Sequence, residues 1–407
     1  MDTTTSFPKD KIKILLLENI HSAAIKQFND QGFQVESISS SLPEEKIIEK
    51  IKDVHVLGLR SKTKVTEKIL DAANRLLAIG CFCIGTDQVD LHAAEKRGIP
   101  VFNSPFCNSR SVAELIIAEI IILSRKLGDR SKEMHEKKWR KESKACHEIR
   151  GKSLGIIGYG HIGSQLSVLA EAMGMSVSYY DIARRLPLGN SKMCPDLKSL
   201  LESNNFITLH VPDTELTRGM IGEEEINTMK KGTYLLNASR GKVVQIPHLA
   251  AALRSGHLAG CAVDVYPSEP EANCDDWETE LQGCPNTILT PHIGGSTEEA
   301  QEAIGLEVSD LIISFINSGA SAGSVNFPEV TMPYSPSTHR ILNIHNNKPG
   351  VLRDINNILS EFNVSGQVLS TRKQIGYIIA DVDSKASKEI KKKISDLPNS
   401  IRTRILY

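Results

Sequence analysis

Three residues whose side chains could move a proton and bind an acid each follow an apolar run of the chain. Arg240 lies in "LLNASRGKVV", Glu269 in "AVDVYPSEP" and His292 in "LTPHIGG". Histidine titrates near neutral pH and can remove a hydroxyl proton, and a carboxylate beside it orients the ring and raises its proton affinity. Arginine binds a carboxylate through paired, charge-assisted hydrogen bonds. Together the three groups suit the oxidation of a 2-hydroxy acid.

Each of these side chains taken singly is more often structural or solvated than catalytic. The combination is stronger, because ligands of open α/β sheets bind at the carboxyl ends of the strands, where all three are expected. Asp264 shortly precedes Glu269 in the same segment. No His/Asp cluster in the sequence has the spacing of metal ligands, and we expect no metal.

A dinucleotide-binding pattern occurs in "SLGIIGYGHIGSQL", which carries G-x-G-x-x-G as Gly158, Gly160 and Gly163 after an apolar run. The first glycine permits a tight turn, the second lets backbone approach a diphosphate, and the third lets the next helix pack on the sheet. Asp181, at the end of the next predicted strand, can accept hydrogen bonds from the adenine ribose and so selects NAD over NADP. Two arginines follow Asp181 closely, which leaves use of NADP open.

The elements that must position these groups form two α/β series. Residues 12–105 and 153–293 each alternate apolar runs with amphipathic stretches, which indicates βαβ units and parallel sheets. Helices are predicted at 109–127, opening on a serine cap, and at 296–317. Residues 317–338 are rich in Ser, Gly, Ala and Pro and are expected to form a linker.

The last seventy or so residues follow a third pattern. From about His339 the order is strand, helix, two strands, helix and strand, which is the ferredoxin-like βαββαβ arrangement. The turn "HNNKPG" precedes its first helix, which Gly350 opens. That helix has a single apolar face, formed by Val351, Ile355, Ile358, Leu359 and Phe362.

Composition excludes several classes of protein. A chain of 407 residues with 40% hydrophobic residues suits two or three globular domains. Its 48 basic and 49 acidic residues give no bulk charge for nucleic acid or an anionic membrane. The longest apolar run, Leu115 to Leu123, is too short to span a bilayer, and the N-terminus has no secretory or transit pattern. The 8 cysteines lack a CxxC pair and are expected to be reduced thiols in a cytoplasmic protein.

Several segments together resemble one enzyme family. "GYGHIGSQLSVLAEAMGM", "NASRGKVV", "AVDVYPSEP" and "TPHIGGSTEEAQ" resemble the D-isomer-specific 2-hydroxyacid dehydrogenases. "GCFCIGTDQVDL" and "FNSPFCNSRSVAELIIAEI" narrow the resemblance to the branch that oxidises 3-phosphoglycerate to 3-phosphohydroxypyruvate with NAD, the first committed step of serine synthesis. The resemblance covers nearly the whole chain, in the form with a single C-terminal ACT domain.

The resemblance implies an α/β protein of three domains. A Rossmann-type NAD-binding domain is expected at 109–301, a flavodoxin-like discontinuous substrate domain at 1–108 plus 302–335, and a ferredoxin-like (ACT) regulatory domain at 338–407. It also implies a homotetramer. Trp139 would anchor an interface with a neighbouring subunit, and Lys141 would reach that neighbour's active site.

The resemblance further implies roles for single residues. His292 would be the acid/base, Glu269 would support it, and Arg240 would hold the substrate carboxylate. The residues expected to contact NAD are Gly158, Gly160, His161, Ile162, Gly163, Asp181, Ala238, Ser239, Arg240, Asp264, His292, Ile293, Gly294 and Gly295. The substrate phosphate would lie near Arg60, Ser61 and Asn108.

The ACT domain is expected to bind L-serine as a feedback inhibitor. The residues expected to contact serine are His345, Asn347, Gly350 and Asn363. The segment "SEFNVSGQ" is a residue shorter than the usual pattern before the matching asparagine, so the strength of inhibition stays open. An inert dimerisation domain is the alternative.

Two other functions stay open. One is another D-2-hydroxyacid dehydrogenase, which would act on D-lactate, glycerate or erythronate phosphate, or reduce 2-oxoglutarate. The ACT domain and Arg60 argue against D-lactate and glycerate. The other is an NAD-responsive scaffold like the corepressors that share this fold, although the chain shows no disordered interaction tail.

Overall fold

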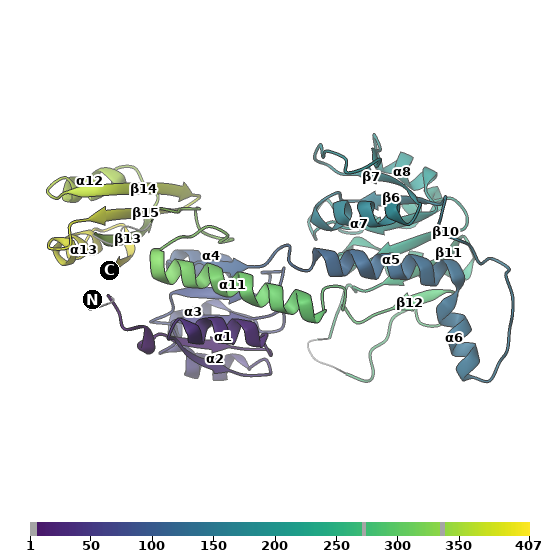
Figure 1. Ribbon diagram of the computed structural model, residues 1–407, viewed down its shortest axis with the longest axis horizontal. Coiled ribbons are helices and arrows are strands. Elements are labelled where there is room, and N and C mark those ends of the chain that lie inside the picture. The colour runs from purple at the N-terminus through teal and green to yellow at the C-terminus, as the bar shows by residue number, and fades with distance from the viewer. Residues whose placement is uncertain (1–5, 271–273, 334–337) are drawn as a thin grey trace. The chain divides into compact units, whose positions relative to one another are not determined.

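The computed structural model describes residues 6–270, 274–333 and 338–407. The chain divides into two compact units (Figure 1). One comprises Met1–Pro105 with Gln301–Tyr407, and the other comprises Phe106–Ala300. No helix in these described ranges is long and apolar enough to cross a membrane.

The first unit begins with a parallel five-stranded sheet in the order β2-β1-β3-β4-β5, which is the flavodoxin-like order. Its central strands are buried on both faces, which explains why they read as continuous apolar runs. The strands are β1 (Lys13–Leu16), β2 (Gln34–Ser37), β3 (Val56–Leu59), β4 (Ala78–Cys81) and β5 (Val101–Asn103). The helices are the 3-10 turn η1 (Lys9–Lys11), α1 (Ser22–Asp30), α2 (Glu44–Ile51), α3 (Glu67–Ala72), α4 (Leu91–Lys96) and α11 (Glu298–Ser318).

The segment after α11 is not the linker that its composition predicts. Residues 319–333 pack on the first sheet, with Ser321, Ser324 and Phe327 buried. The side chain of Asn326 accepts a hydrogen bond from Val101 N at 2.8 Å and donates one to Ile99 O at 3.0 Å. Small polar residues are needed here because their side chains satisfy backbone groups next to β5. Residues 334–337 of the predicted linker lie outside the described residues.

The same segment matches the G-x-S-x-G spacing of a hydrolase nucleophile at Gly319 to Gly323. The structure gives this match no chemical role, because Ser321 is fully buried and its hydroxyl donates to Pro328 O at 2.7 Å. The hydroxyl also accepts from Val330 N at 2.9 Å. Ser321 therefore closes a loop instead of facing a substrate.

The C-terminal part of the first unit has the predicted βαββαβ order, with an antiparallel sheet in the order β14-β15-β13-β16. Helices α12 and α13 cover one face, and the apolar face predicted for α12 packs there. The elements are β13 (His339–Asn346), α12 (Val351–Leu359), β14 (Val364–Arg372), β15 (Ile375–Val382), α13 (Ser387–Ser395) and β16 (Ser400–Leu406).

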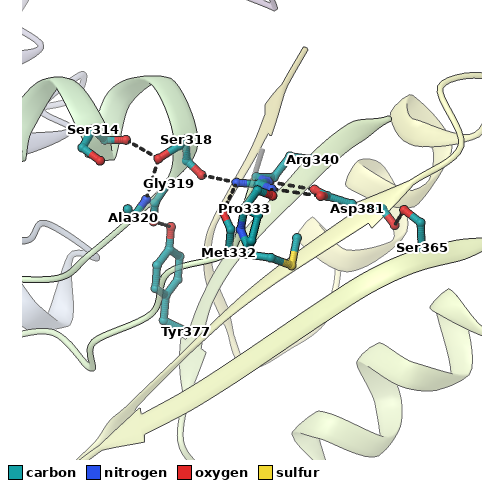
Figure 2. Close-up of polar contacts among 10 residues, drawn as sticks. All are labelled: Ser314, Ser318, Gly319, Ala320, Met332, Pro333, Arg340, Ser365, Tyr377 and Asp381. Carbon is teal, nitrogen blue, oxygen red and sulfur yellow. Dashed lines mark hydrogen bonds and ion pairs between the residues drawn. The ribbon is translucent and has the colours of Figure 1, made fainter. Parts of the chain in front are cut away.

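The other face of this sheet carries a buried ion pair, whose arginine also bonds the end of α11 (Figure 2). Arg340 on β13 pairs with Asp381, opposite it on β15, through two hydrogen bonds of 2.7 and 2.9 Å. The same guanidinium donates to Ser318 O at 3.0 Å, at the end of α11, and Tyr377 Oη donates to Gly319 O at 2.6 Å. Since both charged side chains are almost fully buried, the sheet is joined to the α11 terminus by a specific polar contact.

The second unit has a parallel seven-stranded sheet in the order β12-β11-β10-β9-β6-β7-β8, which extends the Rossmann order. Apolar clusters fill both of its faces. The strands are β6 (Ser153–Ile157), β7 (Ser176–Tyr180), β8 (Lys192–Met193), β9 (Phe206–Leu209), β10 (Thr233–Asn237), β11 (Leu258–Val263) and β12 (Thr287–Leu289). The helices are α5 (Ser109–Arg125), α6 (Leu127–His135), α7 (His161–Ala172), α8 (Leu197–Ser203), α9 (Glu223–Thr228), η2 (Gly241–Val243) and α10 (Ile246–Arg254).

Two details of this unit differ from the sequence prediction. The serine cap predicted for the long helix is wrong, because α5 already includes Ser109 and its N-cap residue is Asn108, which makes no side-chain cap hydrogen bond. The short edge strand β8 was not predicted. Its two residues, Lys192 and Met193, are exposed and carry no apolar alternation.

Candidate active site

The centre of the candidate site is a hydrogen-bonded pair formed by His292 and Glu269. His292 Nδ1 lies 2.8 Å from Glu269 Oε2, and Glu269 Oε1 accepts a hydrogen bond from Tyr266 N at 3.0 Å. The hydrogen bond to Glu269 raises the pKa of His292 and outweighs the lowering effect of burial. Burial raises the pKa of Glu269, but the hydrogen bonds from His292 and Tyr266 bring the net pKa below its ordinary value. Within the described residues no group bonds to Nε2, which can therefore serve a substrate.

Asp264, buried at the end of β11, holds the loop that carries this histidine. Its Oδ1 accepts from Thr290 Oγ1 at 2.6 Å and from Ile293 N at 2.8 Å, and its Oδ2 accepts from Gly294 N at 2.8 Å. These bonds fix the backbone on both sides of His292, which adopts a left-handed φ of 55°. The contact of Asp264 with NAD stays a prediction, and in the structure its carboxylate holds the loop that carries His292.

Arg240 lies in a tight turn at the end of β10. Asn237 organises this turn, because its Oδ1 accepts from Ser239 N at 3.1 Å and its Nδ2 donates to Arg240 O at 3.1 Å. Gly241 is required at the next position, since a Cβ there would lie 1.9 Å from Tyr266 C. Arg240 donates one hydrogen bond to Ser239 O at 2.8 Å, and its charge lowers the pKa of both Glu269 and His292.

The glycine loop follows β6 as predicted. Gly158 has a φ of 93°, and a Cβ on it would lie 2.3 Å from His210 O, while a Cβ on Gly163 would lie 2.3 Å from Gly158 O. A Cβ on Gly160 would meet nothing within 4 Å. Gly160 is the N-cap of α7 and makes no side-chain cap bond, so the free N–H groups of that helix end remain available to a diphosphate.

Asp181 lies beside this loop, at the end of β7. Its Oδ2 accepts from Tyr159 N at 2.8 Å, and its Oδ1 accepts from Ala183 N at 2.8 Å. Arg185 Nε approaches Asp181 Oδ2 at 3.7 Å. The carboxylate is therefore held beside the glycine loop, where a ribose is expected. His161 opens α7 and stacks on Phe106 with a ring-centroid distance of 3.6 Å.

In the first unit, the loop with Arg60 and Ser61 follows β3. Glu18, which is buried, accepts hydrogen bonds from Lys62 N at 3.0 Å and Thr63 N at 2.7 Å, and Gln88 Nε2 donates to Arg60 O at 2.7 Å. The backbone is thus fixed from both sides. No hydrogen bond or ion pair to a described residue involves the Arg60 guanidinium.

The residues predicted to bind serine are divided between surface and interior. Gly350 has a φ of 92° and precedes α12, whereas Asn347 and Asn363 are exposed. Asn347 donates from Nδ2 to Lys373 O at 3.2 Å. His345 is 3% exposed, with Nδ1 at 3.1 Å from Asn343 Oδ1, and burial lowers its pKa. In the single chain His345 therefore lies inside the domain.

Three other predicted residues have different surroundings. Asn108 is buried next to Gly295, and its Oδ1 has no hydrogen-bond partner among the described residues. Trp139 is 80% exposed and Lys141 is also exposed, both in the segment after α6. These positions leave the indole and the ammonium group accessible to another molecule.

Sequence reasoning missed the residues that position the candidate site. Tyr266, Asn237, Thr290 and Glu18 act through hydrogen bonds to or from backbone atoms or other side chains. Tyr266, Asn237 and Thr290 lie close in sequence to the motifs of Glu269, Arg240 and His292, and this proximity is the signal that could have suggested them. Glu18 is far in sequence from the Arg60 loop, so no sequence signal pointed to it. No described group of three His, Cys, Asp or Glu residues is arranged to hold a metal.

Comparison with known proteins places this geometry in a family. The profile described as "D-isomer specific 2-hydroxyacid dehydrogenase, NAD binding domain" matches residues 117–294. The profile described as "AHAS small subunit-like ACT domain" matches residues 341–402. Among solved structures, D-lactate dehydrogenase from Aquifex aeolicus complexed with NAD and lactic acid is similar, with a TM-score of 0.64 and 28% identity over 75% of this chain and 95% of that chain.

Two relatives are similar over essentially the full length. The "D-3-phosphoglycerate dehydrogenase" of Dictyostelium discoideum is 88% identical over 100% of both chains. The protein of the same name from Escherichia coli is 48% identical over 99% of both chains. The resemblance seen in the sequence is confirmed: this chain belongs to the D-3-phosphoglycerate dehydrogenases, NAD-dependent oxidoreductases within the D-isomer-specific 2-hydroxyacid dehydrogenase family.

Proposed function

We propose that this chain oxidises 3-phospho-D-glycerate to 3-phosphohydroxypyruvate with NAD, as the names of its relatives suggest. One observation carries the proposal: the 2.8 Å hydrogen bond between His292 and Glu269 lies in the same unit as Arg240 and a glycine loop suited to a dinucleotide. This arrangement provides a base, a group that raises its proton affinity, and a cation for the substrate carboxylate.

The residues around the glycine loop fit NAD. The open space at Gly160 and the uncapped end of α7 suit a diphosphate, and the fixed carboxylate of Asp181 suits the ribose hydroxyls. Asp181 would also repel a 2′-phosphate, although Arg185 at 3.7 Å reduces that repulsion. Ala238, Ser239, and the loop from His292 to Gly295 are proposed as further contacts.

His292 is proposed as the general base. Its Nε2 takes the proton of the C2 hydroxyl while the C2–H bond breaks and the carbonyl double bond forms. NAD bound at the glycine loop would supply the acceptor for the hydride that leaves C2. Glu269 bonds Nδ1, so it keeps Nε2 unprotonated before the reaction and stabilises the imidazolium afterwards. In the reverse direction His292 returns the proton to the oxygen.

Two arginines are proposed to position the substrate. Arg240 binds the carboxylate and thereby fixes C2 relative to His292. Arg60 binds the phosphate, helped by Ser61, because Glu18 and Gln88 fix the loop backbone and leave the guanidinium without a described partner. Asn108, and Lys141 from a neighbouring subunit of a homotetramer, are proposed as additional phosphate contacts.

The ACT domain is proposed to bind L-serine at the turn before α12. The left-handed Gly350 places the first N–H groups of α12 at this turn, where they can bind a carboxylate, and the side chains of Asn347 and Asn363 remain exposed. Since His345 is buried, we assign it a structural role, in which it supports the "HNNKPG" turn from the interior of the domain. The tetramer would have two arrangements that differ in activity. Serine would inhibit by binding the less active arrangement with higher affinity and so raising its population.

The substrate is tested by NADH consumption with 3-phosphohydroxypyruvate, hydroxypyruvate, pyruvate and 2-oxoglutarate, each with and without L-serine. We expect the highest kcat/KM for 3-phosphohydroxypyruvate and a rate that falls with serine. A higher kcat/KM for an unphosphorylated acid would refute the substrate. Rates unaffected by serine would refute the inhibition and leave the dehydrogenase in place.

A further inference from the structure

The first unit contains a cavity of about 390 Å³ at the junction of the substrate lobe and the ACT sheet. It lies between α4, the Val325–Asn326 segment, and the turn that joins β14 to β15. The inner wall is formed by buried Glu95 and Asn326, whereas His92, Arg372, Lys373 and Gln374 on the rim are exposed. The cavity thus has a buried acidic side and an exposed basic side.

Glu95 is the unusual residue of the inner wall. It is 9% exposed, and among the described residues its carboxylate has no hydrogen bond and no ion pair. The arginine two residues later is directed elsewhere, since Arg97 pairs with Glu67 at 3.2 Å and with Asp71. The Glu95 carboxylate oxygens are not among the fully buried polar atoms that lack a partner, and the residue lines the cavity. The carboxylate can therefore accept hydrogen bonds from a donor bound in the cavity.

Asn326, the other residue of the inner wall, makes no hydrogen bond with Glu95. Its Oδ1 accepts from Val101 N and its Nδ2 donates to Ile99 O at 3.0 Å, so both ends of the amide are used to hold the segment on β5. The carboxylate of Glu95 is the charged group of the inner wall, and it has no hydrogen bond or ion pair with a described residue. A cationic hydrogen-bond donor of small size would satisfy it.

The rim supplies the opposite charge. Arg372 donates from Nη1 to Phe327 O at 3.2 Å, which fixes the guanidinium at the cavity while its other N–H groups remain without described partners. Lys373, at a left-handed φ of 50°, adds a second cation in the same turn. Neither residue forms an ion pair with a described acid. A small ligand that carries both an ammonium group and a carboxylate matches these two opposite charges.

The rim also touches the turn proposed to bind serine. Asn347 N donates to Gln374 O at 2.7 Å, and Asn347 Nδ2 donates to Lys373 O. A molecule bound against Lys373 and Gln374 therefore contacts residues bonded directly to the "HNNKPG" turn. Occupation of the cavity and occupation of the turn would influence each other through this hairpin.

We propose that this cavity is a second effector site, which binds a free α-amino acid with its ammonium group on Glu95 and its carboxylate on Arg372 and Lys373. The proposal concerns binding and does not depend on the reaction catalysed. Charge-assisted hydrogen bonds are worth about 1.5–3 kcal/mol, so loss of either charged partner should weaken binding roughly ten- to a hundredfold.

The test is isothermal titration calorimetry of the full chain with the twenty common L-amino acids, one at a time. We expect at least one to bind with an affinity that Glu95→Gln and Arg372→Gln each lower about ten- to a hundredfold. Glu45→Gln, the same change on exposed α2, should leave the affinity unchanged. Arg372 is exposed, so its variant remains informative if Glu95→Gln fails to fold.

Two further comparisons separate this site from others. The carboxylic acid that lacks only the amino group of the bound amino acid should bind at least tenfold more weakly if Glu95 holds the ammonium group. Equal binding of that acid would overturn the proposal, because it would indicate a simple anion site. No binding at millimolar concentration would overturn it too, as would affinities that Glu95→Gln and Arg372→Gln leave unchanged. If binding is lost in Asn363→Ala but kept in Glu95→Gln and Arg372→Gln, the amino acid binds only at the turn proposed for serine. That result would also overturn the proposal.

Discussion

His292 Nδ1 and Glu269 Oε2 lie 2.8 Å apart, although the two residues come from different loops at the carboxyl ends of β11 and β12. The contact depends on Asp264, which binds the backbone of Ile293 and Gly294, and on Tyr266 N, which holds the second oxygen of Glu269. His292 is thus positioned by hydrogen bonds from its own loop and from the loop of Glu269.

Glu269→Gln should move the pH dependence of the reaction. Glu269 raises the pKa of His292, so the neutral amide will lower that pKa. Oxidation requires the unprotonated imidazole. The rising limb of the pH profile for oxidation should therefore shift to lower pH. Reduction requires the imidazolium, and its activity should be lost at lower pH than in the wild type. Profiles of kcat/KM against pH in both directions check this, and an unmoved limb would refute the role of Glu269.

Arg60→Gln should affect phosphorylated substrates selectively. Loss of a charge-assisted pair with the phosphate should raise KM for 3-phosphohydroxypyruvate by roughly ten- to a hundredfold. The kcat/KM for hydroxypyruvate, which lacks the phosphate, should change little. Lys62→Gln, a change at an exposed neighbour in the same loop, is the matched control. Equal losses with both substrates would contradict the assignment of Arg60 to the phosphate.

Glu119→Gln should stabilise the protein, and more so at alkaline pH. Glu119 on α5 is 2% exposed, its Oε1 has no partner within the described residues, and burial with nearby Asp264 raises its pKa from 4.5 to about 8. The folded state holds this proton more tightly than the unfolded state. Its stabilising contribution is therefore complete below pH 4.5 and is lost as pH rises to about 8.

At the upper end of that range the cost of ionising Glu119 reaches about 5 kcal/mol, at 1.36 kcal/mol per tenfold change in proton affinity. The melting temperature of Glu119→Gln should exceed that of the wild type by more at pH 8 than at pH 5. Glu114→Gln, on an exposed position of the same helix, should show no such pH dependence. A wild type that is as stable at pH 8 as at pH 5 would speak against a protonated Glu119.

Asp381→Asn should loosen the ACT sheet from α11. It leaves the Arg340 guanidinium buried without a counter-charge, which costs on the order of 3–5 kcal/mol. The double change Arg340→Met with Asp381→Leu should cost less, because it removes both buried charges. Urea unfolding measures the difference, with Asp354→Asn, a change at a partly exposed position of α12, as control. A double variant less stable than Asp381→Asn would contradict the account.

Much of the fold could be predicted because buried parallel strands such as β3 and β4 are continuous apolar runs bounded by turns. The positions of Arg240, Glu269 and His292 after strands of one sheet could be predicted because each follows such a run. Their catalytic roles stay predictions. The packing of residues 319–333 could not, since Ser324 and Asn326 are polar residues that stabilise the fold by bonding backbone groups distant in sequence. The same limit applies to Glu18, which follows β1 and whose carboxylate fixes the Arg60 loop.

The central claim is that His292 is the acid/base group, and its most direct test compares His292→Ala with the wild type. NADH consumption with 3-phosphohydroxypyruvate should fall by about 10²–10⁴, while NADH affinity, measured by calorimetry, is largely kept. Turnover close to that of the wild type would contradict the account.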